Sequence, residues 1–171
     1  MIQLISKPRK DISSTELKEI CSLKNEEWKY SLKSQLIWFR QNIQKNDICN
    51  LLKNKGRIIG LTIFRKRTYK IRLKKEKYLL FDTLIISKKF RKKKLSPLLM
   101  ALNTFVILDH NLLSLLICDD RLVKFYEKFG WSKINNKFIA FKDYKFKSNA
   151  LIINQGFKKI QKNIFNFYTK I

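Results

Sequence analysis

The segment from residue 78 to residue 118 limits the folds open to this chain more than any other. Its first part, YLLFDTLII, fits a buried strand, residues 97–108 fit an apolar helix, and LLSLLIC at 112–118 fits a second buried strand. A strand, a helix and another buried strand in direct succession form a parallel crossover. The sequence therefore predicts an α/β fold with a central parallel strand pair at about 78–86 and 112–118.

The residues before this crossover predict two helices and a hairpin. Ser13 and Glu16 fit a capping box for a helix from about 14 to 27, and Ser31 can cap a second helix. The turn Asn54-Lys55-Gly56 lies between two strand-like runs and so predicts a β-hairpin.

The remaining connections and elements are predicted from shorter signals. Residues 70–77 are basic and fit a connection, and the apolar spacing from Leu122 to Phe129 fits a short helix that ends at Gly130. Beyond it, FIAF and ALII fit strands, and the spacing from Phe157 to Phe167 fits a terminal helix.

Composition limits the class of protein and its partners. A chain of 171 residues with 45% apolar residues suits a single domain over residues 1–171. The net charge of +25 favours anionic partners, but the lysines recur from Lys7 to Lys170, which weakens the case for nucleic acid. The compact single domain favours a small-molecule partner, and a homodimer is left open.

The cysteines and the apolar runs indicate a cytoplasmic protein. Cys21, Cys49 and Cys118 have no metal-binding spacing, so neither a disulfide frame nor a metal site is expected. The N-terminus has no apolar run of signal-peptide length. The run at 95–118 is interrupted by polar residues, leaving too short an apolar stretch to span a bilayer, so no membrane partner is expected.

A basic corner, residues 91–96, joins the first strand of the crossover to its helix. Open α/β sheets bind ligands at this edge, and the free N–H groups of a helix start favour anions. Ser96 can act as the N-cap, with Pro97 in the first helical position. A phosphate group fits such a corner, and a solvated turn in a lysine-rich protein is the alternative.

Two segments resemble motifs of the GNAT acyltransferase superfamily. ISKKFRKKKLSPLLM, from Ile86, is similar to its acyl-CoA-binding motif V-x-P-x-Y-R-G-x-G-x-G-x-x-L-L/M, and CDDRLVKFYEKFGW, from Cys118, is similar to a later motif, N-x-R-A-x-x-L/F-Y-E-K-x-G-F/W. Lys92, Lys94 and Ser96 stand where the first motif has glycines, and a β-carbon there raises strain and crowding. The resemblance implies a mixed, mostly antiparallel twisted sheet with helices on both faces.

The resemblance also implies a cofactor site for acetyl-CoA as the acyl donor. The pantetheine would pair with main-chain groups near Leu84, Ile85 and Ile86, in the gap between the two parallel strands, and Asp119 would contact it or only cap its helix. The pyrophosphate would lie over the basic corner, which consists of Arg91, Lys92, Lys93, Lys94, Leu95 and Ser96.

Two residues are candidates for the proton transfers of an N-acetyltransferase. The resemblance implies that Tyr126 protonates the leaving thiolate of CoA. Asp82 is a lone carboxylate in an apolar strand, and it would act as a base, hold the substrate ammonium, or serve as a structural Asp bonded to Thr83.

The acceptor is the least constrained part of the prediction. Trp28, Tyr30 and Trp38 fall in the first two helices and their connection, a region that often lines the acceptor groove in the family, and ordinary packing is the alternative. An amino sugar or a nucleotide sugar is the expected acceptor. Two other functions stay open: a basic nucleic-acid-binding module, and a catalytically silent CoA-binding protein.

Overall fold

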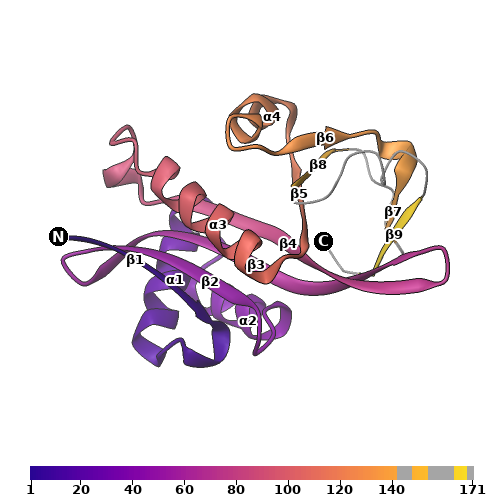
Figure 1. The fold of residues 1–171 in the computed structure, drawn as a ribbon. Coiled ribbons are helices and arrows are strands. Elements are labelled where there is room, and N and C mark those ends of the chain that lie inside the picture. The colour runs from indigo at the N-terminus through magenta and orange to yellow at the C-terminus, as the bar shows by residue number, and fades with distance from the viewer. Residues whose placement is uncertain (142–147, 154–163, 169–171) are drawn as a thin grey trace. The chain divides into compact units, whose positions relative to one another are not determined.

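The computed structural model describes residues 1–141, 148–153 and 164–168 (Figure 1). They form two compact units, the first from Met1–Arg65 and Asp82–Val106 and the second from Lys66–Phe81 and Ile107–Ile171. The elements in chain order are β1 (Ile2–Pro8), η1 (Arg9–Asp11), α1 (Ser14–Glu27), α2 (Leu32–Asn42), β2 (Ile48–Asn54), β3 (Arg57–Ile71), β4 (Lys74–Ile86), η2 (Lys88–Phe90), α3 (Ser96–His110), β5 (Leu113–Cys118), α4 (Asp120–Glu127), β6 (Ser132–Ile134), η3 (Asn136–Phe138), β7 (Ile139–Phe141), β8 (Asn149–Ile153) and β9 (Phe165–Tyr168).

The strands form a mixed sheet in the order β1-β2-β3-β4-β5-β8-β6, and β9 pairs with β3 and β7. The predicted parallel pair is present: β4 and β5 pair over Tyr78–Phe81 and Leu113–Leu116. The pairs β1–β2, β2–β3, β5–β8 and β6–β8 are antiparallel. The predicted mixed, mostly antiparallel sheet with a central parallel pair is therefore confirmed, and β7 and β9 add a second parallel pair.

In the first unit, helices cover both faces of the strands. Ile20 of α1 and Phe39 of α2 pack with Leu61 of β3 on one face. On the other face, Leu99 of α3 packs with Leu52 of β2. Figure 1 shows α1 and α2 on one side of β1, β2 and β3, and α3 on the opposite side. The predicted cover of helices on both faces is thus confirmed.

A buried polar cluster fixes α3 to the strands beneath it. Asn50 Nδ2 and Thr62 Oγ1 both donate to Asn103 Oδ1, at 2.7 and 2.6 Å, and all three residues are fully buried. The helix also lies close to the backbone of Gly60, where a β-carbon would come within 3.0 Å of Leu99 Cδ1. These contacts set the position of the helix that begins at the basic corner.

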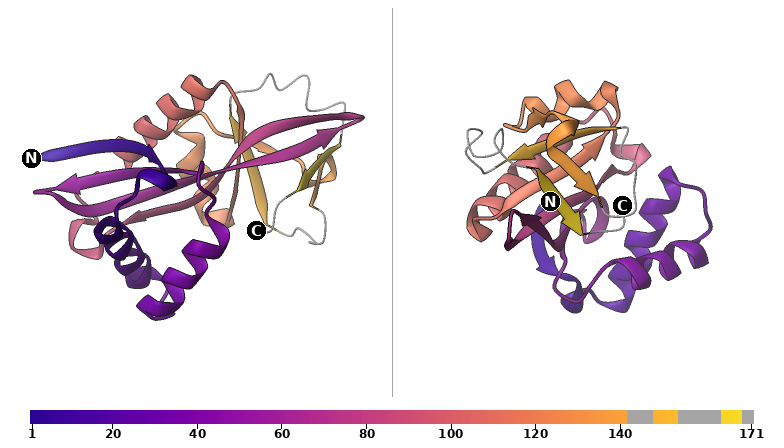
Figure 2. Two further views of the ribbon diagram at one scale, coloured as in Figure 1. Left: turned by 90° about the horizontal axis from the view of Figure 1, so that it is seen from below. Right: turned by 90° about the vertical axis from the view of Figure 1, so that its right-hand side faces the viewer.

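The second unit has its own core of aromatic side chains. Tyr69, Tyr78, Phe141, Phe165 and Phe167 pack in one cluster, with ring centroids 4.8 Å apart for the closest pair, Tyr78 and Phe167. Residues Lys66–Phe81 belong to this unit, and Figure 2 shows these parts of β3 and β4 as a two-stranded ribbon.

Several predictions of local structure were confirmed, and three were wrong. The helix at 14–27, the Ser13 capping box and the Ser31 cap are present. The segment 70–77 is not a connection, because β3 runs to Ile71 and β4 begins at Lys74, where the aromatic cluster gives both strands a buried face.

The other two errors lie at the ends of elements. Leu95, not Ser96, precedes α3, because the Leu95 carbonyl accepts from Leu98 N at 3.2 Å. The terminal helix is wrong at Phe165–Tyr168, which forms β9, and Phe157 lies outside the described residues.

Candidate active site

The basic loop, residues 91–96, has the backbone shape that glycines would give it. Lys92 has a φ of 66° and Lys94 a φ of 53°, both in the left-handed region. These are the two positions at which the acyl-CoA motif has its first and central glycines. The loop thus adopts the left-handed conformation at both positions, although L-residues are disfavoured there.

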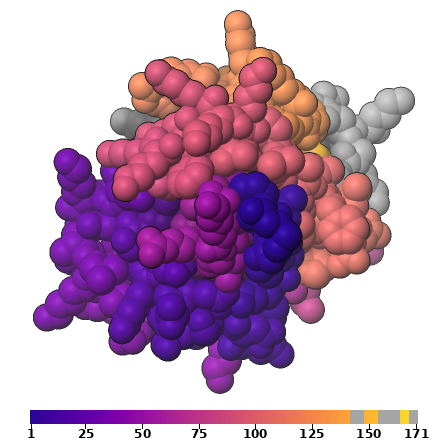
Figure 3. Space-filling model, turned by 90° about the vertical axis from the view of Figure 1, so that its left-hand side faces the viewer, coloured from indigo at the N-terminus to yellow at the C-terminus, as the bar shows by residue number. Residues whose placement is uncertain are grey.

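The main-chain N–H groups of this loop are available for an anion. Within the described residues, none of the N–H groups from residue 92 to residue 94 donates a hydrogen bond, nor do those of Leu95 and Ser96. The side chains of residues 92–94 are exposed, and Figure 3 shows long side chains projecting from this part of the chain, coloured pink. A turn with converging free N–H groups beside cationic side chains binds phosphate oxygens well.

Arg91 is directed away from this turn. Its Nε donates to the Ile86 carbonyl at 3.1 Å, and its guanidinium forms an ion pair with Glu27. Arg91 therefore holds the loop to β4 and α1, and the three lysines carry the positive charge of the exposed turn.

The end of β4 leaves main-chain groups open beside this loop. Pairing with β5 ends at Phe81, so in the part of the chain that the structure describes residues 82–86 have a strand partner only on the β3 side. Ser87 N closes the β3 side by donating to the Ile59 carbonyl at 2.8 Å. Leu84, Ile85 and Ile86 thus keep one edge to which an extended ligand can bond.

A pocket of about 500 Å3 in the first unit contains the four residues predicted for the acceptor side and for the base. This tryptophan pocket is lined by Lys24, Trp28, Tyr30, Ser34, Gln35, Trp38, Asp82 and Thr83. Gln35 donates to the Trp28 carbonyl at 2.9 Å and so fixes the connection between α1 and α2. The pocket combines aromatic faces with one carboxylate and one ammonium.

Asp82 is held by two donors in this pocket. Arg65 Nη1 donates to Asp82 Oδ2 at 2.9 Å, and Thr83 Oγ1 donates to Asp82 Oδ1 at 2.9 Å. The side chain of Arg65 is 6% exposed and that of Asp82 is 16% exposed, so the pair is largely withdrawn from water. The carboxylate is thereby oriented, and it remains part of the pocket wall.

Tyr126 lies in the second unit, on the inner face of α4. It is 6% exposed and packs edge-on against Phe81, with ring centroids 5.8 Å apart. Burial, with a smaller contribution from Cys118, raises the pKa of Tyr126 far above its usual value of 10. The hydroxyl therefore stays protonated near neutral pH, as a proton donor must.

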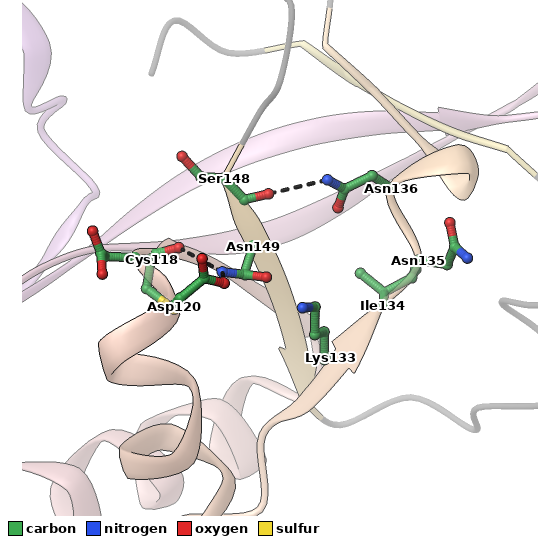
Figure 4. Close-up of a pocket in the computed structure, with 9 residues that line it drawn as sticks. Cys118, Asp120, Lys133, Ile134, Asn135, Asn136, Ser148 and Asn149 are labelled. Carbon is green, nitrogen blue, oxygen red and sulfur yellow. Dashed lines mark hydrogen bonds between the residues drawn. The ribbon is translucent and has the colours of Figure 1, made fainter.

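Asp119 caps α4. Its carboxylate accepts from Arg121 N at 3.0 Å and from Arg121 Nε at 2.9 Å, and the hydrogen bonds to Arg121 lower the pKa of Asp119. It also borders a second, polar pocket of about 450 Å3 (Figure 4). There Asn149 donates to Asp120 at 2.7 Å, and Asn136 donates to the Ser148 carbonyl at 3.1 Å.

The described residues contain neither a cluster of metal ligands nor a helix that could cross a bilayer. Among them, no three side chains of His, Cys, Asp or Glu gather as a metal site would require. Within the same ranges, no helix has both the length and the apolar character needed to cross a bilayer.

Comparison with known proteins identifies the fold. No family model and no curated protein sequence matches the chain. Among solved structures, the chain is similar to the GNAT family N-acetyltransferase YhbS of Escherichia coli, solved in complex with CoA, with a TM-score of 0.68 and 11% identity over 98% of this chain and 91% of that one. The chain has the GNAT fold.

Other solved GNAT structures show the same likeness. An acyl-CoA N-acyltransferase of Pseudomonas aeruginosa has a TM-score of 0.64 at 10% identity, over 89% of this chain and 99% of that one. The ribosomal-protein-S18-alanine N-acetyltransferase of Escherichia coli has a TM-score of 0.61 at 13% identity, over 89% and 91% of the two chains. At these identities the comparison establishes the GNAT fold and leaves the chemistry to the residues.

Lys24 is the site residue that sequence reasoning missed. It is 4% exposed, and its Nζ lies 3.3 Å from the ring centroid of Trp38 and 5.6 Å from that of Trp28. Burial lowers the pKa of Lys24 to about 8, although Asp82 raises it in part. A signal was present, because Lys24 continues the helical spacing of Leu17, Ile20 and Cys21, which places a lysine on the apolar face of α1.

Proposed function

We propose that the chain is an N-acyltransferase that moves an acetyl group from acetyl-CoA directly to the primary amine of a small acceptor, such as an amino sugar or a nucleotide sugar. The observation that carries this proposal is the backbone of the basic loop, with left-handed Lys92 and Lys94 at the glycine positions of the acyl-CoA motif. Two similar structures solved with CoA, YhbS and the PaiA N-acetyltransferase of Thermoplasma acidophilum, support the choice of donor.

The first unit supplies the groups that would bind the donor. The N–H groups of residues 92–96 and the lysine side chains bind the pyrophosphate, and the open edge at residues 84–86 bonds to the amides of the pantetheine arm. Asp119 is proposed as a further contact for this arm. Acetyl-CoA supplies the acetyl group as a reactive thioester.

The tryptophan pocket would hold the acceptor. An alkylamine has a pKa of about 10, so it is largely protonated near neutral pH and must lose a proton before it attacks the thioester carbonyl. We assign Asp82 to this step, either as the base or as the group that holds the ammonium. Trp28, Tyr30 and Trp38 offer faces on which a sugar or a nucleoside can stack.

Tyr126 would complete the transfer by donating its proton to the departing thiolate. The new amide bond forms as the bond from carbon to sulfur breaks, and the thiolate leaves as the thiol of CoA. The hydroxyl carries its proton near neutral pH, and the raised pKa makes it a weaker acid than an exposed tyrosine.

A melting-temperature measurement with acetyl-CoA tests the proposal. Acetyl-CoA at about 100 times its Kd should stabilise the chain by about 2.7 kcal/mol, which corresponds to a rise of about 5–10 °C. The double variant Lys93→Glu/Lys94→Glu should lose this rise, because it places anions beside the pyrophosphate.

The matched control is Lys74→Glu/Lys75→Glu, which makes the same change of charge at exposed positions of the β3–β4 ribbon. It should keep the full rise. The proposal is refuted if acetyl-CoA, CoA and longer acyl-CoAs all leave the melting temperature unchanged at millimolar concentration.

A catalytically silent CoA-binding protein is the second candidate. It is favoured by the two donors that already hold Asp82, since both carboxylate oxygens accept a hydrogen bond within the protein. A melting-temperature rise with acetyl-CoA, together with no acetylation across a broad panel of amines, would decide for this candidate.

A further inference from the structure

Lys24 is a buried cation that has no anionic partner within 4 Å among the described residues of the first unit. Its side chain is more than nine-tenths buried and lines the tryptophan pocket. Within the described ranges, its ammonium forms no ion pair within 4 Å and donates no hydrogen bond; its only close partners are the faces of Trp38 and Trp28. A buried ammonium usually has an anionic partner, because removing its charge from water costs free energy.

The nearby carboxylate does not fill this need. Among the described residues, Asp82 forms no ion pair with Lys24 within 4 Å, and Arg65, which donates to Asp82, brings a second buried cation into the same region. Lys24 and Arg65 thus place two positive charges near the carboxylate of Asp82. A ligand group that neutralises Lys24 must be an anion.

The rest of the pocket defines what accompanies that anion. Asp82 offers a carboxylate to an ammonium, and the indoles of Trp28 and Trp38 offer apolar faces to the atoms between the two charged groups. A volume of about 500 Å3 suits a molecule of one or two rings. A polyamine fits poorly, because one of its ammonium groups would face Lys24.

We propose that the tryptophan pocket binds an amine that also carries a phosphate or a carboxylate, and that Lys24 pairs with this anionic group. The role of this amine as the acceptor of the acetyl group rests on the proposed acyltransferase function. Its binding to the pocket does not. The lowered pKa of Lys24 agrees with a cation that lacks its partner until the ligand binds. The pairing is a charge-assisted contact at a largely buried lysine.

Calorimetric titration of the whole chain with two matched pairs of compounds tests this, with and without CoA. The pairs are glucosamine 6-phosphate against glucosamine, and phenylalanine against phenylalaninamide. We expect the anionic member of at least one pair to bind about tenfold more tightly, since a hydrogen bond to a charged group contributes about 1.5–3 kcal/mol. The pair that shows the preference distinguishes phosphate from carboxylate.

Two substitutions assign the preference to Lys24. Lys24→Met keeps the aliphatic packing on Trp38 and should abolish the preference, while raising the melting temperature of the free protein because a buried charge is removed. Lys24→Arg should keep part of the preference for the anionic compound. Lys33→Met, at an exposed position of α2 outside the pocket, removes the same charge and should change nothing.

Three results would overturn the inference: equal binding of both members of each pair, a preference that survives in Lys24→Met, or no binding of any of the four compounds in either condition. None of these outcomes bears on the rise of melting temperature with acetyl-CoA. Conversely, an anion preference without any effect of acetyl-CoA would refute the acyltransferase and leave the pocket assignment in place.

Discussion

Replacing Lys94 by glycine should stabilise the protein, and replacing its neighbour Lys93 should not. Lys94 has a φ of 53°, whereas Lys93 is not among the residues with positive φ. The left-handed conformation costs an L-residue about 1–2 kcal/mol. Both substitutions remove one positive charge from the same exposed turn, and both increase the freedom of the unfolded chain by a similar amount.

The difference between the two variants therefore reports the cost of the left-handed conformation, together with the contact of Lys93 Nζ with the Phe90 ring at 5.2 Å, which Lys93→Gly also removes. We expect Lys94→Gly to be more stable than Lys93→Gly by about 1–2 kcal/mol, or about 2–8 °C in melting temperature for a chain of this size. Thermal unfolding followed by circular dichroism in the absence of ligand measures this difference, and Lys92→Gly should behave like Lys94→Gly. Equal melting temperatures for Lys93→Gly and Lys94→Gly would show that the loop does not hold the proposed backbone shape.

Two further predictions concern other parts of the molecule. Tyr126→Phe should lower the turnover of an accepted amine about 100-fold while the melting-temperature rise with acetyl-CoA is kept, and unchanged turnover would remove Tyr126 from the acid role. Burial alone would raise the pKa of Glu16, but hydrogen bonds from Lys7 and Lys53 outweigh it and lower this pKa to about 2. The stability that Glu16 contributes is therefore fully present above its ordinary pKa of 4.5 and is lost as the pH falls from 4.5 towards 2. Glu16→Gln should lose about 1–2 kcal/mol at neutral pH and show a flatter acid transition by thermal melting, whereas Asp11→Asn, at an exposed position, should leave the stability at neutral pH unchanged.

Local chemistry made much of the fold predictable. The Ser13 capping box depends on residues three positions apart, and the crossover depends on unbroken apolar runs, so a short window of sequence contains each signal. By contrast, β1 is mostly exposed and shows no alternation, since its place comes from pairing with β2, far along the chain. The ribbon at residues 70–77 was missed for a similar reason, because its buried partners lie in the distant strand β9.

The sequence was enough to name several residues of the candidate site, but it did not predict the contacts between them. Trp28, Tyr30, Trp38 and Asp82 were named from the sequence, and the tryptophan pocket brings them together. The bond from Arg65 to Asp82 joins residues on two strands, and no local pattern specifies it. The left-handed lysines were equally hidden, because sequence preference argues against the conformation that the loop adopts.

The buried cluster of Asn50, Thr62 and Asn103 has a consequence for the basic loop. An apolar helix such as α3 could rest on a sheet in several rotational settings, since apolar contacts have little direction. Asn103 Oδ1 can accept from both of its buried donors in only one of these rotational settings. A shift of one residue would turn the helix by about 100° and break both bonds. Asn103 thus fixes the rotation of α3 about its own axis. The direction in which the first N–H groups of the helix point is therefore set by a buried side chain about two turns further along the helix.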